Sequence, residues 1–206
     1  MTDPTSTPAA DALYQEALQV FDGLLEDARE AGDPEPTAMT LATSANGRVS
    51  ARIVLLKGVD SRGFRFFTNY GSDKGRQLAA EPVVALVFHW KTLRSGVQVR
   101  VEGRAERLPA AESDVYFATR PRGSQLGAWA SLQSDTLDER ATFERRIEEL
   151  ERRFADVPVP RPAHWGGYVV APSRIEFWYG ADFRLHERQC YERDERGAWT
   201  RRMLYP

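Results

Sequence analysis

The chain has 206 residues, with 28 Lys and Arg against 30 Asp and Glu and a formal net charge of -2. This balance excludes a globally basic surface for nucleic acid or anionic membrane, so any anion site must be a local cluster of basic residues. The single cysteine, Cys190, excludes an intramolecular disulfide and a cysteine-based zinc site, and three scattered histidines form no metal motif. We expect no metal. No apolar run spans a bilayer and no signal core opens the chain, so we expect a soluble, cytoplasmic protein.

The N-terminal part predicts a tail followed by a helix. Residues 1–10 are polar and rich in Pro and Thr, which is typical of a disordered tail. From Asp11, apolar residues recur at helical spacing, and Gly32 with the Asp33-Pro34 pair ends the pattern. Since no linker or repeat interrupts the rest of the chain, residues 11–206 are expected to form a single domain.

The next part predicts strands separated by tight turns. Five runs are rich in β-formers: 37–44, 49–57, 63–69, 82–90 and 97–108. Asn46-Gly47 between the first two is a strong hairpin signal. Ser72 can cap a short helix that ends at Ala80.

The second half predicts two helices and more strands. Pro109 can open a helix that Pro121 ends, and a longer amphipathic helix begins near Asp138. The Pro-rich segment 157–162 is a stiff connector. Four strand-like runs complete the chain: 167–170, 174–178, 183–193 and 198–204. Many strands with few helices indicate an α+β domain, mainly β, built on a barrel.

Basic residues near the C-terminus form one candidate anion site. If 183–193 is a strand, Arg184, His186 and Arg188 share one face, because side chains alternate along a strand. Two guanidinium groups beside an imidazole suit an anionic ligand. A solvated face with the charges paired to Glu187 or Asp194 explains the pattern equally well.

A second candidate combines Tyr116, Arg120 and Ser124. Tyr116 and Arg120 are four residues apart on the predicted helix, so they face the same way, and Ser124 lies shortly after them. A phenol, a guanidinium and a hydroxyl could hold a phosphate. From these residues alone, an ordinary helix end with a C-terminal Arg is the simpler interpretation.

Two weaker signals lie earlier in the chain. Arg52 and Lys57 bracket an apolar run and have opposite parity, so a regular strand places them on opposite faces unless a bulge re-aims one. Ser72 and Lys74 lie at a predicted helix start, where free N–H groups favour an anion, but Asp73 between them opposes it.

A set of motifs carries a family resemblance. The motifs are RIVLLKG (52–58), FFTNYGSDKG (66–75), VRVEGRAERL (99–108), YFATRPRGSQLGAWAS (116–131), HWGGYVVAPSRIEFWYG (164–180) and RLHER (184–188). In this order they resemble the pyridoxamine 5′-phosphate oxidase family over nearly all of residues 11–206. The resemblance implies a split β-barrel with peripheral helices, whose homodimer binds two FMN molecules at its interface.

The resemblance also assigns residues to two ligands, position by position. FMN would contact Arg52, Ile53, Val54, Leu55, Leu56, Lys57, Phe67, Thr68, Lys74, Gln98, Gln133, Ser134, Trp178 and Arg188. Pyridoxamine or pyridoxine 5′-phosphate would contact Lys57, Tyr116, Arg120, Ser124, Arg184 and His186. Arg184 and His186 would be the catalytic residues beside the pyridine ring. Dioxygen would accept the electrons, giving pyridoxal 5′-phosphate and hydrogen peroxide.

The sequence departs from the family pattern at three places. Asp73 stands where the family usually has an Arg that helps to hold the FMN phosphate, and Met203 also replaces a usual Arg. The stretch Leu93–Gln98 is two residues longer than the usual pattern, which shifts the alignment of Gln98 with the family. Two alternatives therefore stay open: a related FMN-dependent oxidoreductase acting on another small ring substrate, and a non-catalytic flavin or pyridoxal phosphate binding protein.

Overall fold

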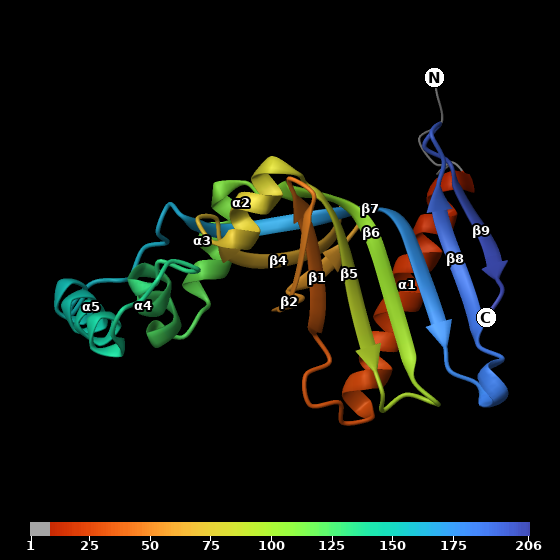
Figure 1. Cartoon of the computed structure of the whole chain (residues 1–206), viewed down its shortest axis with the longest axis horizontal. Helices are drawn as coiled ribbons and strands as arrows, with labels where there is room; N and C mark the ends of the chain where they lie inside the picture. Colours follow the sequence, from red (N-terminus) through yellow and green to blue (C-terminus); the bar gives the residue numbers. More distant parts are fainter. Residues whose placement is uncertain (1–8) are drawn as a thin grey trace, which may run out of the picture.

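The computed structural model describes residues 9–206, and these form a nine-stranded antiparallel sheet with helices around it (Figure 1). The strands are β1 (Ala38–Ala45), β2 (Arg48–Leu55), β3 (Gly58–Asp60), β4 (Gly63–Asn69), β5 (Val83–Trp90), β6 (Val97–Arg107), β7 (Trp165–Tyr179), β8 (Glu187–Arg193) and β9 (Trp199–Leu204). Their order is β2-β1-β5-β6-β7-β4-β3, with β8 paired to β7 and β9 to β8. Since β2 also contacts β4, the sheet curls into a barrel, which confirms the predicted mainly-β α+β class.

The helices are α1 (Ala9–Glu30), α2 (Asp73–Ala80), α3 (Ala110–Ala118), α4 (Arg122–Ala130) and α5 (Arg140–Arg153), with a 3₁₀ turn, η1, at Asp182–Arg184. The first helix begins at Ala9, so the predicted tail is wrong for residues 9 and 10, and residues 1–8 lie outside the described part. The sequence pattern did not predict α4. None of the helices in residues 9–206 combines the length and apolarity needed to cross a membrane.

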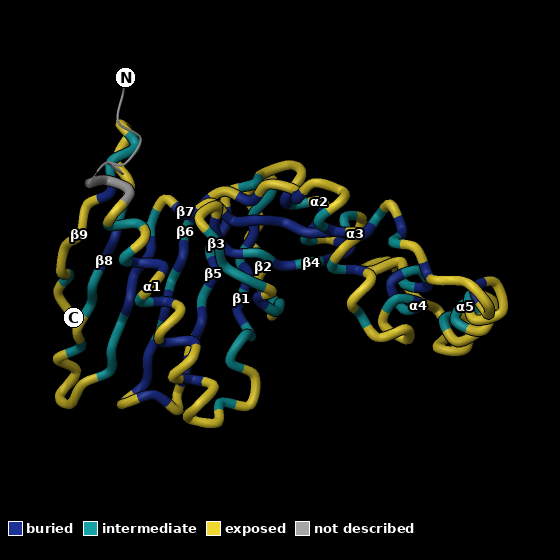
Figure 2. The backbone as a smooth tube through the Cα atoms, turned by 180° about the vertical axis from the view of Figure 1, so that it is seen from behind, coloured by how far each residue is buried: buried dark blue, intermediate teal, exposed yellow. Residues whose placement is uncertain are grey.

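The main core lies between α1 and the concave side of the sheet. Ala17, Phe21 and Ala28 on α1 are fully buried, and the Phe21 ring meets those of Phe64 and Phe88 at 4.9 Å in edge-on contacts. In the view from behind, the dark buried segments run along α1 and the central strands (Figure 2). This packing makes the barrel a rigid support for the polar groups at its rim.

A smaller core holds α3, α4 and α5 together beside the barrel. Its buried members include Phe117, Leu126, Phe154 and Trp165, the last being the first residue of β7. Figure 1 shows α4 and α5 at the end of the molecule away from β8 and β9. The two cores meet where β4 and the start of β7 run beside α3. Residues from both cores therefore border this region.

Local signals explain most of the turns. Asn46 and Gly47 have φ of 51° and 72°, as a two-residue hairpin requires, and Ser72 caps α2 by accepting a hydrogen bond from the Gly75 N–H. The predicted runs 167–170 and 174–178 are parts of one strand, because a register shift at Glu102/Gly103 on β6 accommodates the intervening Pro.

Candidate functional site

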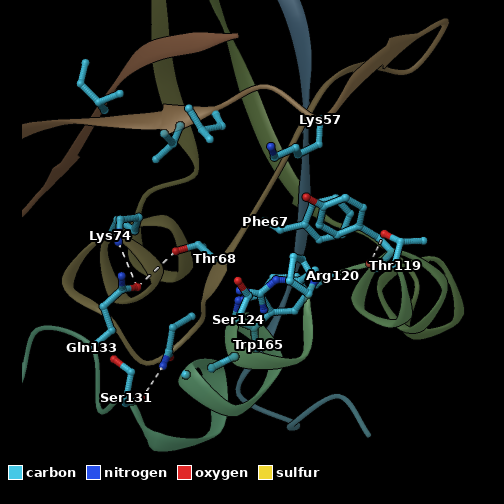
Figure 3. A pocket seen from close by; sticks show the side chains of 18 residues that line it. Lys57, Phe67, Thr68, Lys74, Thr119, Arg120, Ser124, Ser131, Gln133 and Trp165 are labelled. Carbon is cyan, nitrogen blue, oxygen red and sulfur yellow. Dashed lines mark hydrogen bonds between the residues drawn. The ribbon is translucent and has the colours of Figure 1, made fainter. Parts of the chain in front are cut away.

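A cavity of about 690 Å³ opens between the barrel rim and helices α2, α3 and α4 (Figure 3). Eleven of the predicted ligand-binding residues line it: Ile53, Val54, Leu55, Lys57, Phe67, Thr68, Lys74, Tyr116, Arg120, Ser124 and Gln133. They come from β2, β4, α2, α3, α4 and the loops beside these elements. The fold therefore brings together side chains that are as much as 80 positions apart in the chain, Ile53 to Gln133.

One end of the cavity is built around the guanidinium of Arg120. The helix α3 ends at Ala118, so Arg120 lies just beyond it rather than on it, and Ser124 lies in the first turn of α4. No carboxylate among residues 12–206 forms an ion pair with Arg120, and its buried Nη1 has no hydrogen-bond partner there. Burial lowers the pKa of Arg120 and raises that of Tyr116. A partly buried cation without an anion fits an anionic ligand.

Aromatic rings form the wall behind this end. The rings of Phe67 and Tyr116 stack at 3.9 Å, and those of Phe67 and Trp165 at 5.4 Å. The guanidinium carbon of Arg120 lies 4.5 Å from the Trp165 ring centroid. The sequence pattern did not predict Trp165 as a site residue. Its sequence context is a turn before a strand, and no local pattern shows that a distant Arg lies over its ring.

The other end of the cavity lies at the N-terminus of α2. The Lys74 ammonium donates to Gln133 Oε1 at 3.2 Å, and Thr68 Oγ1 donates to the same oxygen at 3.4 Å. Arg52 reaches the same helix, donating to Gln77 Oε1 at 2.9 Å. Burial, and then the nearby charge of Arg52, lower the pKa of Lys74. Two cations beside a helix N-terminus suit a phosphate.

Asp73, the unusual residue at this helix start, points outward. Its side chain is 65% exposed and forms an ion pair with Arg76 at 2.7 Å. Its backbone N–H donates to Ser134 Oγ at 3.1 Å, so Ser134 adjoins the α2 N-terminus although it does not line the cavity. The negative charge is therefore partly neutralised by a neighbour one helical turn away.

Between the two ends, β2 supplies an apolar wall. Ile53 is 63% exposed despite its apolar side chain, whereas Leu56 is buried and does not line the cavity. Because β2 ends at Leu55, the alternation of a strand does not extend to Lys57. Arg52 points to α2 and Lys57 lines the cavity, so the two cations do serve different places.

Five further predicted residues form a second group on β6, β7, β8 and the turn before β8: Gln98, Trp178, Arg184, His186 and Arg188. Gln98 and Trp178 are register partners, since the longer stretch before Gln98 is taken up by the turn that contains Gly96, with φ of 99°. The His186 ring lies 4.5 Å from the Trp178 ring. Arg188 forms an ion pair with Glu176 at 2.7 Å, and not with either acidic residue that the sequence suggested. The extra residues thus leave Gln98 within this group.

The predicted strand face of Arg184, His186 and Arg188 is wrong. Phe183 and Arg184 have φ of 55° and 63° inside η1, and β8 begins after His186. The left-handed backbone breaks the alternation that would have aligned the three side chains. They remain close in sequence, with Arg184 and His186 before β8 and Arg188 on it.

The two groups are separate within one chain. None of Gln98, Trp178, Arg184, His186 and Arg188 lines the cavity. The strand β7 begins at the cavity with Trp165 and ends at Tyr179, shortly before η1, and Figure 1 shows that turn far from α3 and α4. Among residues 12–206, whose side chains the structure describes, no three His, Cys, Asp or Glu are grouped to hold a metal ion.

Comparisons with known proteins agree with the motifs. Residues 25–154 match the family model described as pyridoxamine 5′-phosphate oxidase, and residues 165–206 match the pyridoxine 5′-phosphate oxidase C-terminal dimerisation region. The chain is 54% identical to the pyridoxine/pyridoxamine 5′-phosphate oxidase of Xanthomonas oryzae pv. oryzae over 196 residues, 94% of this chain and 98% of that protein. It is 55% identical to the protein of the same name from Rubrobacter xylanophilus over 199 residues, 96% of this chain and 90% of that one.

Solved structures share the fold over most or all of the chain. The crystal structure of PhzG from Burkholderia lata 383, in complex with tetrahydrophenazine-1-carboxylic acid, is 31% identical with a TM-score of 0.87, and the match covers 100% of both chains. A pyridoxamine 5′-phosphate oxidase-related, FMN-binding protein from Nostoc punctiforme has a TM-score of 0.71 at 17% identity and covers 89% and 96% of the two chains, which bears on the fold alone. The split-barrel fold is thereby confirmed, and the chain belongs to the pyridoxine/pyridoxamine 5′-phosphate oxidase family.

Proposed function

We propose that the protein is an FMN-dependent oxidase of pyridoxamine 5′-phosphate, pyridoxine 5′-phosphate or both. It transfers electrons from the substrate to dioxygen and releases pyridoxal 5′-phosphate and hydrogen peroxide. The observation that carries this proposal is the unneutralised guanidinium of Arg120, with its unpartnered buried Nη1, at the end of a cavity of about 690 Å³. The membership of the oxidase family agrees with it.

The residues at the α2 end fit FMN. Its phosphate would lie by Lys74 and the α2 N-terminus, with Arg52 behind, where two cations lie together and the nearby Asp73 is paired with Arg76. The flavin ring would lie along the exposed apolar wall at Ile53 and its neighbours. An apolar side chain that is 63% exposed beside a basic cluster is well suited to a flat ring that carries a phosphate tail.

The residues at the Arg120 end fit the substrate phosphate. Tyr116 and Ser124 can each donate a hydrogen bond, and Arg120 offers several N–H groups in one plane. Lys57 also lines the cavity and would bridge the flavin and the substrate ring. In Figure 3 the labelled side chains of Lys57 and Arg120 lie on the same side of the cavity as the aromatic rings.

The second group is proposed to complete the site from another copy of the chain. Phe183, Leu185 and Tyr205 are 92%, 70% and 93% exposed. Large apolar side chains exposed together are typical of a surface that contacts another protein. The matched C-terminal region is described as a dimerisation region. A homodimer that covers these side chains would carry Arg184, His186 and Arg188 to the partner's cavity, giving two equivalent sites.

When bound, FMN would supply the redox chemistry, as a two-electron acceptor for the substrate that dioxygen can regenerate. The protein supplies placement and charge. Arg184 would press on the pyridine ring and favour the negative charge that develops there. His186 accepts a hydrogen bond from the Ala181 N–H at Nδ1, so its neutral form carries the proton on Nε2 and can donate to the substrate. Arg120 and its neighbours would fix the far end of the substrate.

The direct test is oxidation by the purified protein. We expect a flavin spectrum, and formation of pyridoxal 5′-phosphate and peroxide when pyridoxamine 5′-phosphate is added in air.

A second candidate function, oxidation of a reduced phenazine carboxylate, is motivated by the similarity to PhzG at 31% identity. Turnover of that substrate without turnover of the B6 phosphate would favour it. Bound flavin without turnover of either would favour a binding protein.

The shared site has its own test, in which two inactive variants are mixed. Arg120→Ala damages the cavity group and Arg184→Ala the second group. After the subunits exchange, each mixed dimer has one site with both groups intact, so random pairing restores about a quarter of full activity. Sites built within single chains would stay inactive in every pairing.

A further inference from the structure

We propose that Trp165 is a positioning residue that makes the site prefer phosphorylated substrates, because it holds the Arg120 guanidinium by its face. The inference rests on the proposed function, in which Arg120 binds the substrate phosphate. It adds a residue that neither the motifs nor the family comparisons assign to the site.

The first observation is how Arg120 is held. Its guanidinium carbon lies 4.5 Å from the Trp165 centroid and 5.4 Å from that of Phe117, and no carboxylate of the described residues forms an ion pair with it. A carboxylate partner would occupy the in-plane N–H groups and neutralise the charge. A ring face attracts the cation from above and leaves those N–H groups free for a phosphate.

The second observation is that Trp165 itself is firmly fixed. Its side chain is 7% exposed, its backbone N–H donates to Pro162 O at 3.0 Å, and its carbonyl accepts from Arg161 at 2.6 Å. It pairs with Asn69 across β4 and β7. The ring therefore cannot follow the guanidinium if Arg120 moves, and it acts as a fixed platform.

The third observation links Trp165 to the rest of the phosphate group. Its ring lies nearly parallel to that of Tyr116, at 6.2 Å and 6°, with Phe67 stacked on both. One aromatic stack thus sets the distance between the phenol of Tyr116 and the guanidinium of Arg120. A phosphate needs both donors at a fixed separation, so a change in the platform should weaken phosphate binding more than flavin binding.

The experiment compares Trp165→Phe, which keeps an aromatic side chain but weakens the attraction for the cation, with Trp129→Phe as a matched control. Trp129 belongs to the same small core and also has an Arg over its ring, Arg153 at 5.2 Å, but it does not line the cavity. Trp165→Phe should raise KM for pyridoxamine 5′-phosphate roughly fivefold to thirtyfold, leave kcat and the FMN Kd nearly unchanged, and leave KM for unphosphorylated pyridoxamine unchanged. Trp129→Phe should change none of these.

A binding measurement keeps the test independent of turnover. Titration of the flavin-loaded protein with inorganic phosphate should give a weaker Kd for Trp165→Phe by a similar factor, and no further loss when the same change is made in Arg120→Met. An unchanged phosphate Kd, or an equal further loss in Arg120→Met, would overturn the inference. Failure of the proposed function would instead appear as absence of oxidation by the unaltered protein. If Trp165→Phe does not fold, Trp165→Leu, judged by the same titration, replaces it.

Discussion

The guanidinium of Arg188 is held by the buried carboxylate of Glu176, with Nε at 2.9 Å and Nη2 at 2.7 Å from Oε1. The Glu176 side chain is 2% exposed, and its other oxygen receives Arg174 at 3.1 Å and Arg100 at 3.4 Å. Three partly exposed arginines thus share one buried anion on β7. The arrangement explains why Arg188, a proposed flavin contact, does not pair with the acidic residues beside it in sequence.

Replacing Glu176 by Gln should destabilise the fold. The change leaves three guanidinium groups around a neutral amide, and removal of one partner from a buried ion pair costs about 3 kcal/mol, reduced here toward roughly 2 kcal/mol because the arginines are partly exposed. Urea unfolding should show a lower midpoint at an unchanged slope. The control is Glu192→Gln, which breaks an exposed pair with Arg202 and should cost about 0.5 kcal/mol or less. Equal losses in the two variants would mean that the buried pair has no special weight.

Arg184→Ala should leave FMN bound and lower kcat by at least about a hundredfold, since the residue is proposed to act on the substrate ring and not on the flavin. Steady-state kinetics and the flavin absorbance of the purified variant measure the two effects separately. Arg196→Ala, an exposed change in the turn before β9, should leave both values unaltered. A fully active Arg184→Ala enzyme would remove Arg184 from the mechanism.

The sequence predicted those parts of the fold that have local causes. The hairpin at Asn46-Gly47 and the cap at Ser72 result from backbone preference and from one side-chain hydrogen bond. The helix α4 was missed because it contains Gly123 and Gly127, which weaken a helical pattern, and because it directly succeeds Pro121. Its formation depends on packing in the smaller core, and no local stretch of the sequence indicates that packing.

In the candidate site, too, the features with local causes were predicted and those that depend on distant parts of the chain were not. Residues near one another in a motif, such as Tyr116, Arg120 and Ser124, were predicted as a group and do share the cavity. The conformation of Arg184 was not predictable, because neither it nor Phe183 is a glycine and yet both have positive φ. The separation of the two groups along β7 is a long-range property of the sheet. Neither hydrophobic periodicity nor residue spacing reports it.

Asp73→Arg should tighten FMN binding. The change replaces a negative charge by a positive one at the α2 N-terminus, beside the proposed phosphate site, and at a near-surface dielectric this gives about 1 kcal/mol, or roughly fivefold in Kd. The gain is limited because Arg76 already pairs with Asp73. Fluorescence titration of the FMN-free protein measures the Kd. The same charge change at the other end of α2, Glu81→Arg, should leave it within about twofold. No gain from Asp73→Arg would place the FMN phosphate away from this helix end.

FMN affinity should fall at alkaline pH, and the fall should begin at a lower pH than it would for a lysine with an ordinary pKa. Burial and the charge of Arg52 lower the pKa of Lys74 from its usual 10.5. Below the lowered pKa the ammonium is charged and attracts the phosphate, and above it the attraction is lost, so the Kd should rise as pH passes through that value. Loss of one charge-assisted hydrogen bond predicts a rise of about tenfold.

Lys74→Arg tests the assignment of this pH dependence. An arginine stays protonated throughout, so the variant should keep a nearly constant FMN Kd from neutral pH into the range where the unaltered protein weakens. Both proteins are titrated with FMN in the same buffers and at the same ionic strength, because screening would otherwise change the phosphate attraction. If Lys74→Arg weakens over the same pH range as the unaltered protein, another group titrates there, and Lys74 does not bind the phosphate through its charge.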